Sequence, residues 1–410
     1  MYSCHEQDLV ELLQRQLGSV RREAWPQPDL TANPFLSLWE QSARLYAIAP
    51  DAEHPDALGM ELLGRIEDAG YWPLMQRVQR DTLGLREMGM RVTTSGGALV
   101  FRPIFPDLAE AHAAPSRPSV PLAFAEWTQD PRFGWVRLAA DIRGEPRYTA
   151  TTDKGDDVTG EVLGGTEWQY NGADGPVLPY VLYHAAETGW LFDPYSLREV
   201  VEGALNIGMF LTMFGHIVLN ASWPQRYAAG VIVESGTDGG ADAARRTVVT
   251  DPATLLLLGV EEGHQPMIGQ WGAAADPEVI LRAISMYERR ILTLAGLEGS
   301  DVTRQSADIR SGYSLVVKRE AVREQQRLSA PAFRRGDLEV IRTCAVALNT
   351  AEGRGYPEAG YSITYRGLPP SPVEDAAKRE HVTELLDRGV ITADEARAAL
   401  ADVIGRLEIA

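Results

Sequence analysis

The residues best suited to metal binding or redox chemistry are seven histidines and two cysteines. The histidines are scattered, without the spacing of metal ligands, at His5, His54, His112, His184, His216, His264 and His381. The segment HEQDL begins like the zinc motif HExxH, but Leu9 replaces the second histidine. Cys4 and Cys344 are too few for a disulfide framework or a cysteine-based zinc site. We therefore expect no metal ion and no cofactor.

The motifs of nucleotide hydrolysis and acyl transfer are also missing. The sequence contains neither GxxxxGK[ST] nor GxSxG. Four carboxylates gather in a turn-rich stretch, at Asp153, Asp156, Asp157 and Glu161. Their spacing does not follow a calcium-binding EF-hand loop, so a solvated loop is the better interpretation.

A carbohydrate-active hydrolase stays an alternative. The two carboxylates that cleave a glycosidic bond meet in space and not along the chain, so spacing cannot exclude them. Nine tryptophans and an acidic composition suit sugar binding. The tryptophans are spread along the chain without a cluster, however, which is more typical of core or interface anchors.

Length and charge limit the remaining classes. A chain of 410 residues predicts two or three domains at about 150 residues each. The formal net charge of −18 disfavours a basic face that reads DNA sequence. It does not exclude a protein that encloses DNA without gripping it. The first residues lack a basic region followed by an apolar stretch, so we expect no signal peptide and a cytoplasmic origin.

The order of hydrophobic patterns predicts an α+β fold. Residues 1–90 show helical spacing, with Leu9, Leu13 and Leu17 on one helix face. Residues 91–190 alternate short apolar runs with turn residues, as in a small antiparallel sheet. Further short strands are expected between residues 225 and 275, and a return strand within YSITYRG.

A helix expected over residues 196–220 carries an unusual absence of charge. No Asp, Glu, Lys or Arg occurs from Gly203 to Gln225, although Asn206 and His216 lie inside. The stretch is long enough to cross a membrane. The alternative is a helix covered on every side by protein, in a core or between subunits. It should stop before Trp223, because a proline follows.

A second helix is expected over residues 276–297, with Asp276 as its N-cap and Pro277 in its first turn. A polar loop follows, and then a long helix over residues 313–349 that Pro331 should kink. Arg319, Arg323 and Arg327 form one stripe on that helix. The stripe is either a solvated face or a face toward another subunit or nucleic acid.

The C-terminal residues predict two short helices. Ser371–Glu374 and Thr392–Glu395 are capping boxes, and Gly389 separates the helices as a C-cap. The pair resembles a helix-turn-helix in outline only, and a structural end piece is the commoner interpretation.

Two stretches carry a resemblance to a known family. They are LPYVLYHAAETGWLFDPYSLREVVEGALNIGMFLTMFGHIVLNASWPQRYAAG and GLEGSDVTRQSADIRSGYSLVVKREAVREQQRLSAPAFRRGDLEVIRTCAVALN. Together with the order of segments, they resemble the portal proteins of tailed bacteriophages. The resemblance covers residues 178–349 and, more loosely, the C-terminal tail. No short invariant motif defines this family.

The resemblance implies a portal-like α+β fold, mainly helical, with a β-rich wing and a small α/β clip, assembled as a ring of twelve subunits. The regions it implies are an N-terminal wing (1–195), a first stem helix (196–224), a clip (225–275), a second stem helix (276–297), a tunnel loop (298–312), a wing helix with return strand (313–370) and a crown (371–410). The subunit-facing residues of the uncharged helix would be Met209, Phe210, Met213 and Phe214.

The implied function is a non-enzymatic channel at one vertex of a virion capsid. Double-stranded DNA would pass through it during packaging, be retained, and leave at ejection. Its implied partners are the major capsid protein, the terminase large subunit and later a head–tail adaptor, with no membrane. The tunnel loop would carry Asp301, Arg304, Gln305, Asp308 and Arg310, with Gly299 and Gly312 as hinges. An acidic wall would let the duplex slide, because it repels phosphates.

Overall fold

The computed structural model describes residues 4–17, 28–29, 38–40, 42–164, 167–193, 197–222, 225–229, 255–258, 267–271, 276–295, 320–366, 372–397 and 399–400. The chain divides into two compact units. Unit 1 consists of Met1–Pro34 and Glu199–Leu294, and unit 2 of Phe35–Arg198 and Ala295–Ala410. The N-terminal region expected over residues 1–195 is therefore split, because its first 34 residues belong to unit 1.

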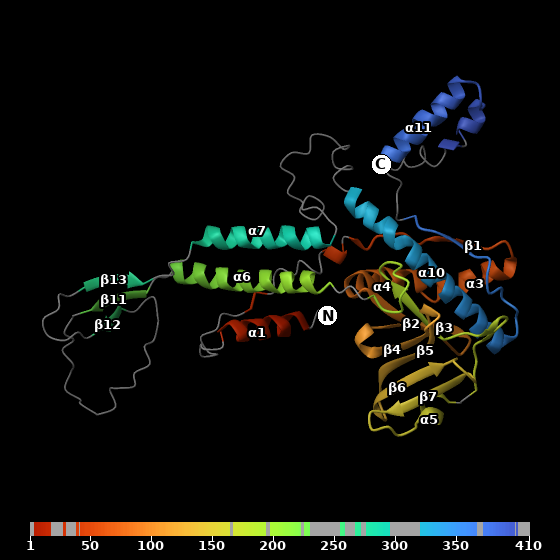
Figure 1. Ribbon diagram of the computed structural model, residues 1–410, viewed down its shortest axis with the longest axis horizontal. Coiled ribbons are helices and arrows are strands. Elements are labelled where there is room, and N and C mark those ends of the chain that lie inside the picture. The colour runs from red at the N-terminus through yellow and green to blue at the C-terminus, as the bar shows by residue number, and fades with distance from the viewer. Residues whose placement is uncertain are drawn as a thin grey trace. The chain divides into compact units, whose positions relative to one another are not determined.

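The described residues of unit 1 form three helices and a small sheet, which Figure 1 shows. The helices are α1 (Cys4–Leu17), α6 (Arg198–Ser222) and α7 (Pro277–Leu294). The strands are β11 (Gln225–Ala229), β12 (Leu255–Leu258) and β13 (Met267–Trp271). The central strand β11 pairs parallel with β12 and antiparallel with β13. The chain thus runs along α6, forms the sheet, and returns along α7.

Local signals set the ends of both long helices of unit 1. α6 ends at Ser222, directly before Trp223 and Pro224, as expected. α7 begins at Pro277, and the Asp276 carboxylate accepts a hydrogen bond of 2.9 Å from the backbone N–H of Glu278. The N-cap prediction is confirmed.

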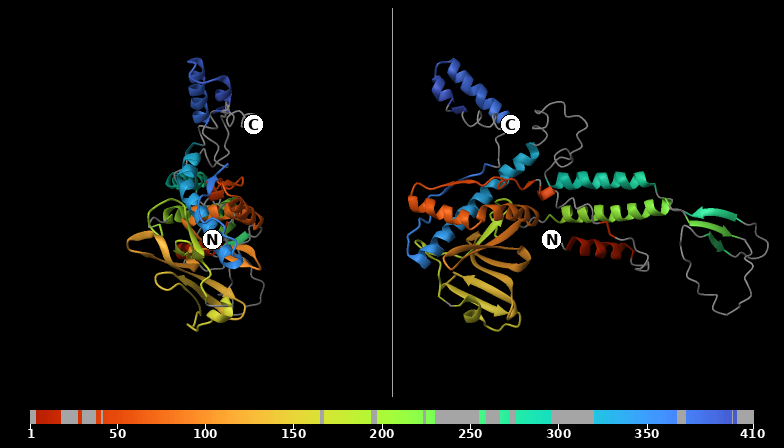
Figure 2. Two further views of the ribbon diagram at one scale, coloured as in Figure 1. Left: turned by 90° about the vertical axis from the view of Figure 1, so that its right-hand side faces the viewer. Right: turned by 180° about the vertical axis from the view of Figure 1, so that it is seen from behind.

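The two larger sheets among the described residues of unit 2 are antiparallel and confirm the sheet expected over residues 91–190 (Figure 2). One has the strand order β4-β5-β6-β7, with β4 (Ala109–Ala114), β5 (Arg117–Asp130), β6 (Gly134–Asp141) and β7 (Arg147–Thr152). The other has the order β10-β2-β3, with β10 (Tyr180–His184), β2 (Glu87–Ser95) and β3 (Ala98–Ile104). Between them, Phe124 and Tyr180 stack with ring centroids 4.6 Å apart.

Smaller elements complete the β structure. The return strand β14 (Ser362–Thr364) pairs antiparallel with β1 (Asp51–Glu53), which confirms the strand expected in YSITYRG. A two-stranded ribbon joins β8 (Asn171–Gly172) to β9 (Gly175–Pro176). The short helices η2 (Pro106–Leu108) and α5 (Thr159–Leu163) flank the four-stranded sheet.

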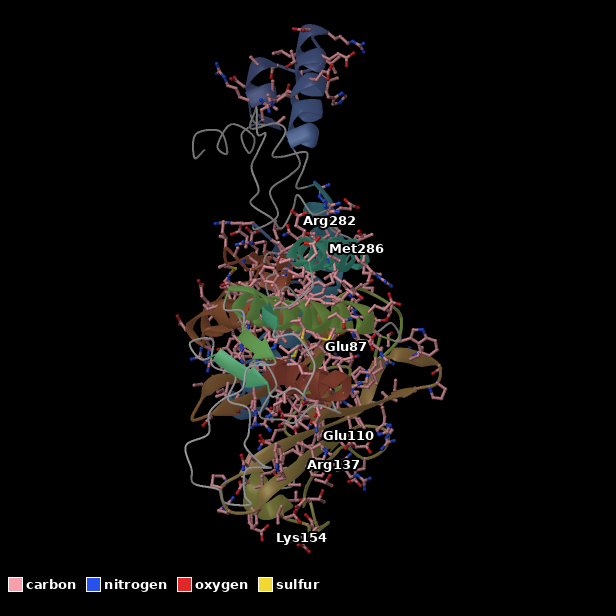
Figure 3. All side chains as sticks on the ribbon, turned by 90° about the vertical axis from the view of Figure 1, so that its left-hand side faces the viewer. Glu87, Glu110, Arg137, Lys154, Arg282 and Met286 are labelled. Atoms are coloured by element: carbon pink, nitrogen blue, oxygen red, sulfur yellow. The ribbon has the colours of Figure 1, made fainter. Side chains whose placement is uncertain are left out.

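Hydrogen bonds between charged and aromatic side chains join three strands on the outer face of the four-stranded sheet. Glu110 on β4 accepts hydrogen bonds from the indole of Trp127 on β5 (3.1 Å) and from Arg137 on β6 (2.6 Å). Figure 3 labels Glu110 and Arg137 on this sheet. The bond from Arg137 lowers the pKa of Glu110, so the carboxylate stays charged and ties the three strands together.

Four longer helices belong to unit 2, namely α3 (Ala57–Asp68), α4 (Tyr71–Leu85), α10 (Glu320–Glu352) and α11 (Pro372–Asp387). α10 continues through Pro331 without a break and packs on β10 and β2. A Cβ atom added at Gly336 of α10 would lie 2.4 Å from Cε1 of Tyr183 on β10. The helix therefore comes closest to this strand at a residue that has no side chain. The kink predicted at Pro331 stays a prediction.

A buried carboxylate joins distant parts of unit 2. Asp337 of α10 is fully buried. Its Oδ1 accepts hydrogen bonds from the hydroxyls of Tyr71 (2.7 Å) and Tyr183 (3.0 Å), and its Oδ2 from Tyr46 and Tyr365 (both 2.8 Å). Burial raises the pKa of Asp337 to about 6, although the four hydroxyl donors oppose that shift. We call these five residues the tyrosine–aspartate cluster.

The C-terminal residues contain the second predicted capping box. The backbone N–H of Thr392 donates to Oε2 of Glu395 (2.8 Å), and the N–H of Glu395 donates to Oγ1 of Thr392 (3.3 Å). Gly389, which follows α11, has φ +69°, as a C-cap residue requires. Both predictions are confirmed, and the capping box at Ser371 lies outside the described residues. The described chain is mixed helix and sheet, as the α+β prediction states.

Candidate subunit interface

α6 and α7 pack against each other in antiparallel orientation. A Cβ atom added at Gly203, near the start of α6, would lie 2.8 Å from Cγ1 of Ile291, near the end of α7. The rings of Phe210 and Tyr287, nearer the middle of both helices, have centroids 5.4 Å apart. Figures 1 and 2 show the two helices side by side. These contacts define the side of α6 that faces α7.

α1 covers a second side of α6. A Cβ atom at Gly208 would lie 3.2 Å from Cδ2 of Leu9 on α1, and both Leu9 and Leu13 are buried, as their spacing predicted. The Thr212 hydroxyl accepts a hydrogen bond of 2.9 Å from the backbone N–H of Asp29. The N-terminal residues therefore hold the side of α6 that carries Gly208 and Thr212.

Helix geometry places the methionines of α6 on a third side. Successive residues of an α-helix are turned by about 100°. Gly208 faces α1 and Phe210 faces α7, so Met209 between them faces neither. Met213 lies one turn further along the same side, and both methionines are half-buried. We call Leu205, Met209 and Met213 the open face of α6, with the exposed Glu202 at its first turn.

α7 has an exposed apolar side of its own. Ile284 and Ile291 are buried, whereas Val279 and Met286 are 61% and 64% exposed. Their spacing of seven residues puts Val279 and Met286 on one side of α7, opposite the buried isoleucines. The exposed Arg282 and Arg290 share this side. We call Val279, Arg282, Met286 and Arg290 the outer face of α7; Figure 3 labels Arg282 and Met286.

The four residues predicted at a subunit interface divide between two sides of α6. Met209 and Met213 lie on the open face, where another molecule can reach them. Phe210 contacts Tyr287 of the same chain, and Phe214 follows it one turn later on the α7 side. Phe210 thus takes part in packing within the subunit. Contact of Met209, Met213 and Phe214 with another subunit stays a prediction.

The other candidate residues are mostly outside the part of the chain that the structure describes. This holds for the tunnel-loop residues Asp301, Arg304, Gln305, Asp308 and Arg310, for the hinges Gly299 and Gly312, and for Arg319. Arg323 lies in α10, but its side chain is not described. Arg327 is half-buried on α10.

Sequence reasoning missed the outer face of α7. The signal that could have found it is the pair Val279 and Met286, seven residues apart among arginines. Apolar residues occur on every side of this helix, however. Periodicity alone therefore does not show which of them pack inside the subunit. The contacts of Gly203 and Phe210 on α6 make that distinction.

α6 is long and apolar enough to cross a membrane by length and composition. Its neighbour α7 argues against a lipid environment. Glu288, Arg289 and Arg290 are exposed on α7, and Tyr287 beside them contacts the middle of α6. A bilayer around α6 would surround these charges, which costs several kcal/mol for each one near the bilayer centre. Protein is therefore the better cover for the open face.

Carboxylates in the turn after β7 support the local backbone. Asp157 accepts a hydrogen bond of 2.9 Å from the backbone N–H of Thr159, and Asp153 and Asp156 are exposed. This agrees with the solvated loop expected there. Within the described residues, no group of three or more His, Cys, Asp or Glu side chains is placed to hold a metal ion.

No family model matches the sequence, and no curated protein matches it. Two similar solved structures are chains of gene transfer agent particles. One is from the virion of the native particle, with 14% identity, a TM-score of 0.47, and coverage of 96% of this chain and 93% of that chain. The other is from the neck of the native particle, computed with C12 symmetry, with 15% identity and the same TM-score and coverage.

Proposed function

We propose that this chain is the subunit of a portal, a ring that surrounds double-stranded DNA at one vertex of a phage-like capsid. The supporting observation is the path of the chain in unit 1. It runs along α6, forms a small sheet, returns along α7, and is followed by the long helix α10. Portal proteins, which the sequence resembles, have a stem helix, a clip, a second stem helix and a wing helix in this order.

In this proposal α6 and α7 are the stem helices, and β11, β12 and β13 are part of the clip. The sheets of unit 2 with α10 form the wing, and α11 begins the crown. α1 reinforces the first stem helix, because Leu9 packs on it at Gly208. The clip binds the terminase large subunit first and a head–tail adaptor later, and the major capsid protein surrounds the ring.

The negative net charge of the chain suits a channel through which DNA slides better than a site that binds DNA tightly. A net charge of −18 makes tight binding to phosphates unfavourable, so the duplex slides. The proposed ring performs no catalysis, and ATP hydrolysis belongs to the packaging motor. The half-buried methionines of the open face of α6 and the exposed Val279 and Met286 of α7 supply apolar surface for contacts between subunits.

Native mass spectrometry and negative-stain images of the purified full-length chain test this proposal. We expect a particle of about twelve times 45.0 kDa, with a central pore in the view down its axis. Particles assembled with this chain should protect packaged DNA from nuclease, and particles without it should not. A monomer that hydrolyses oligosaccharides would contradict the proposal and support a carbohydrate-active enzyme.

A further inference from the structure

We propose that residues 185–193 form a proton-sensitive strap, held closed at its neck by Arg86, Glu87 and Asp193. The strap is the segment that follows β10 on the way to α6. It closes more firmly when the neck takes up a proton, and it loosens when the neck becomes negative. This inference goes beyond the proposed portal and does not depend on it.

Arg86 fastens both ends of the strap. At the first end, its backbone carbonyl accepts a hydrogen bond of 2.8 Å from the N–H of Ala185. At the last end, its guanidinium binds Oδ2 of Asp193 through Nε (2.9 Å) and Nη2 (2.8 Å), and the Asp193 side chain is only 4% exposed. A surface loop whose two ends meet in this way is an Ω-loop, a class that often carries function.

The backbone of Arg86 indicates that its side chain does more than end α4. Arg86 has φ +74°, and among the residues that the structure describes it is the only one other than glycine with a positive φ. Glycine adopts this conformation without strain and is the usual residue for it at the end of a helix. An arginine there is strained, and such strain persists only where the surroundings hold it. The bonds of the guanidinium to Asp193 are contacts of that kind.

Glu87 adds a second buried carboxylate to the neck. It is 6% exposed, it is labelled in Figure 3, and it accepts a hydrogen bond from the backbone N–H of Asp193. Burial raises the pKa of Glu87 to about 7, and the negative charge of Asp193 adds to the rise. The N–H of Asp193 and the charge of Arg86 oppose this shift in the pKa.

The neighbouring strand and helix do not bring a free positive charge to Glu87. His184 of β10 lies opposite Glu87 in the strand register. Burial, and then the charge of Arg335, lower the pKa of His184 to about 4, so its ring is neutral at physiological pH. Arg335 of α10 is itself paired with Glu339 (3.5 Å). Above about pH 7 two carboxylates therefore share the guanidinium of Arg86, and a proton on Glu87 balances the charges.

The direction of the pH dependence follows from the pKa of Glu87. When the strap opens, Glu87 regains water and its pKa returns toward the ordinary value of 4.5. The closed strap therefore binds the proton more tightly than the open strap does. This support for closing is complete below the ordinary pKa and is lost as the pH rises through about 7.

The strap carries one buried and two exposed apolar side chains. Leu191 is buried in the core between the two larger sheets of unit 2, whereas Trp190 and Phe192 on either side of it are 59% and 38% exposed. A closed strap holds the two aromatic side chains in fixed positions, and an open strap releases them together with Leu191. Asp193 also fixes the point from which the chain continues toward α6, which begins at Arg198.

Hydrogen exchange in the full-length chain tests the strap, with mass spectrometry of the peptide that covers residues 185–193. After correction for the intrinsic pH dependence of exchange, we expect about ten-fold faster exchange at about pH 8 than at about pH 5.5, because the neck loses its proton over that range. Peptides of α10 are the internal reference for unfolding of the whole unit.

Glu87→Gln separates the proton from the hydrogen bond. The amide oxygen still accepts the N–H of Asp193, but the side chain no longer titrates, so exchange of the strap should be slow at both pH values. Glu145→Gln, at an exposed position between β6 and β7, is the matched control and should keep the native pH dependence. A native strap that exchanges equally at both pH values would overturn the proposal. So would Glu87→Gln with the pH dependence of the native chain.

Arg86→Gly tests the fastening at the neck. This substitution relieves the backbone strain but removes the guanidinium from the buried carboxylate of Asp193. Exchange of residues 185–193 should rise at least about ten-fold, and chymotrypsin should cleave faster after Trp190 and Phe192. A strap as well protected as in the native chain would mean that Arg86 serves only to end α4. An equal loss of protection in α10 would assign Arg86 to the fold of unit 2 as a whole, and either result would overturn the proposal.

Discussion

In unit 2, four tyrosine hydroxyls from distant parts of the chain surround the buried carboxylate of Asp337. In unit 1, Met286 and Val279 leave more than half of their side-chain surface exposed, and Met209 is only half-buried. Unit 2 satisfies even a buried charge with its own residues. The helix pair of unit 1 carries apolar side chains that stay exposed or half-buried among the described residues.

The difference separates two kinds of stability. The cluster in unit 2 contributes to folding of a single chain, so its effect is present at any protein concentration. Apolar faces on α6 and α7 contribute only when another molecule covers them, so their effect depends on concentration. Substitutions in the two regions should therefore change different measurements.

The largest effect is expected from Met209→Asp. A carboxylate on the open face would be buried without a partner in the assembled protein, so the ring should be lost. Native mass spectrometry should show monomers, and the free energy of unfolding of the monomer should fall by only about 1 kcal/mol, because Met209 is half-buried in the single chain. Val390→Asp is the control, because Val390 is equally apolar and 66% exposed outside unit 1. Rings that persist with Met209→Asp would place the subunit contact elsewhere.

Phe333→Ala should have the largest effect on folding. Phe333 of α10 is fully buried and lies beside the rings of Tyr46 and Tyr183. Removing it leaves a cavity and should lower the free energy of unfolding by about 3–5 kcal/mol, as measured by urea denaturation. Leu328→Ala on the same helix is the control, because Leu328 is 66% exposed. A change below 1 kcal/mol for Phe333→Ala would mean that this core is loosely packed.

Asp337→Asn should change how stability depends on pH. The native pKa of Asp337, about 6, exceeds the ordinary value of about 3.9 for an unfolded chain. The native state therefore binds the proton more tightly, and the contribution of Asp337 to stability falls as pH rises from about 4 to about 6. This contribution should change by about 2–3 kcal/mol over that range and then stay constant.

Urea denaturation at several pH values measures this contribution as the difference between the native chain and the Asp337→Asn variant. Asp68→Asn, at the exposed end of α3, is the control and should leave the pH dependence unchanged. The stability difference between the native chain and Asp337→Asn could instead grow with rising pH. That result would mean that the four hydroxyl donors lower the pKa of Asp337 by more than burial raises it.

The smallest effect is expected from Thr392→Ala. The hydroxyl of Thr392 caps the N–H of Glu395, and its loss should destabilise the short helix of residues 393–397 by about 1 kcal/mol. Hydrogen exchange should become faster in that helix and stay unchanged in α10. Thr383→Ala, on an exposed position of α11, should leave the exchange of residues 393–397 as it was.

Local features of the fold were predictable from the sequence. Asp276 and Thr392 cap helices through atoms two and three residues away, so the signal and its effect lie in the same short segment. Leu9 and Leu13 reveal one helix face by spacing alone. The end of α6 at Ser222 follows from the proline two residues later.

Long-range contacts were not predictable in the same way. Tyr46 and Asp337 are 291 residues apart, and no spacing rule relates them. For the same reason the sequence did not show that Phe210 packs on Tyr287, nor that the first 34 residues belong with α6. For the candidate interface, composition identified the uncharged helix, but the exposed side became clear only from the contacts on its other two sides.

The absence of a side chain at Gly336 has a consequence for mutational tolerance. A single added methyl group would reach the ring of Tyr183 and displace a hydroxyl that binds Asp337. Alanine is an excellent helix former, yet at this position of α10 it should be poorly tolerated, and every larger side chain should be tolerated less. Tolerance at residue 336 should follow side-chain size and not helix propensity, because the constraint comes from the neighbouring strand.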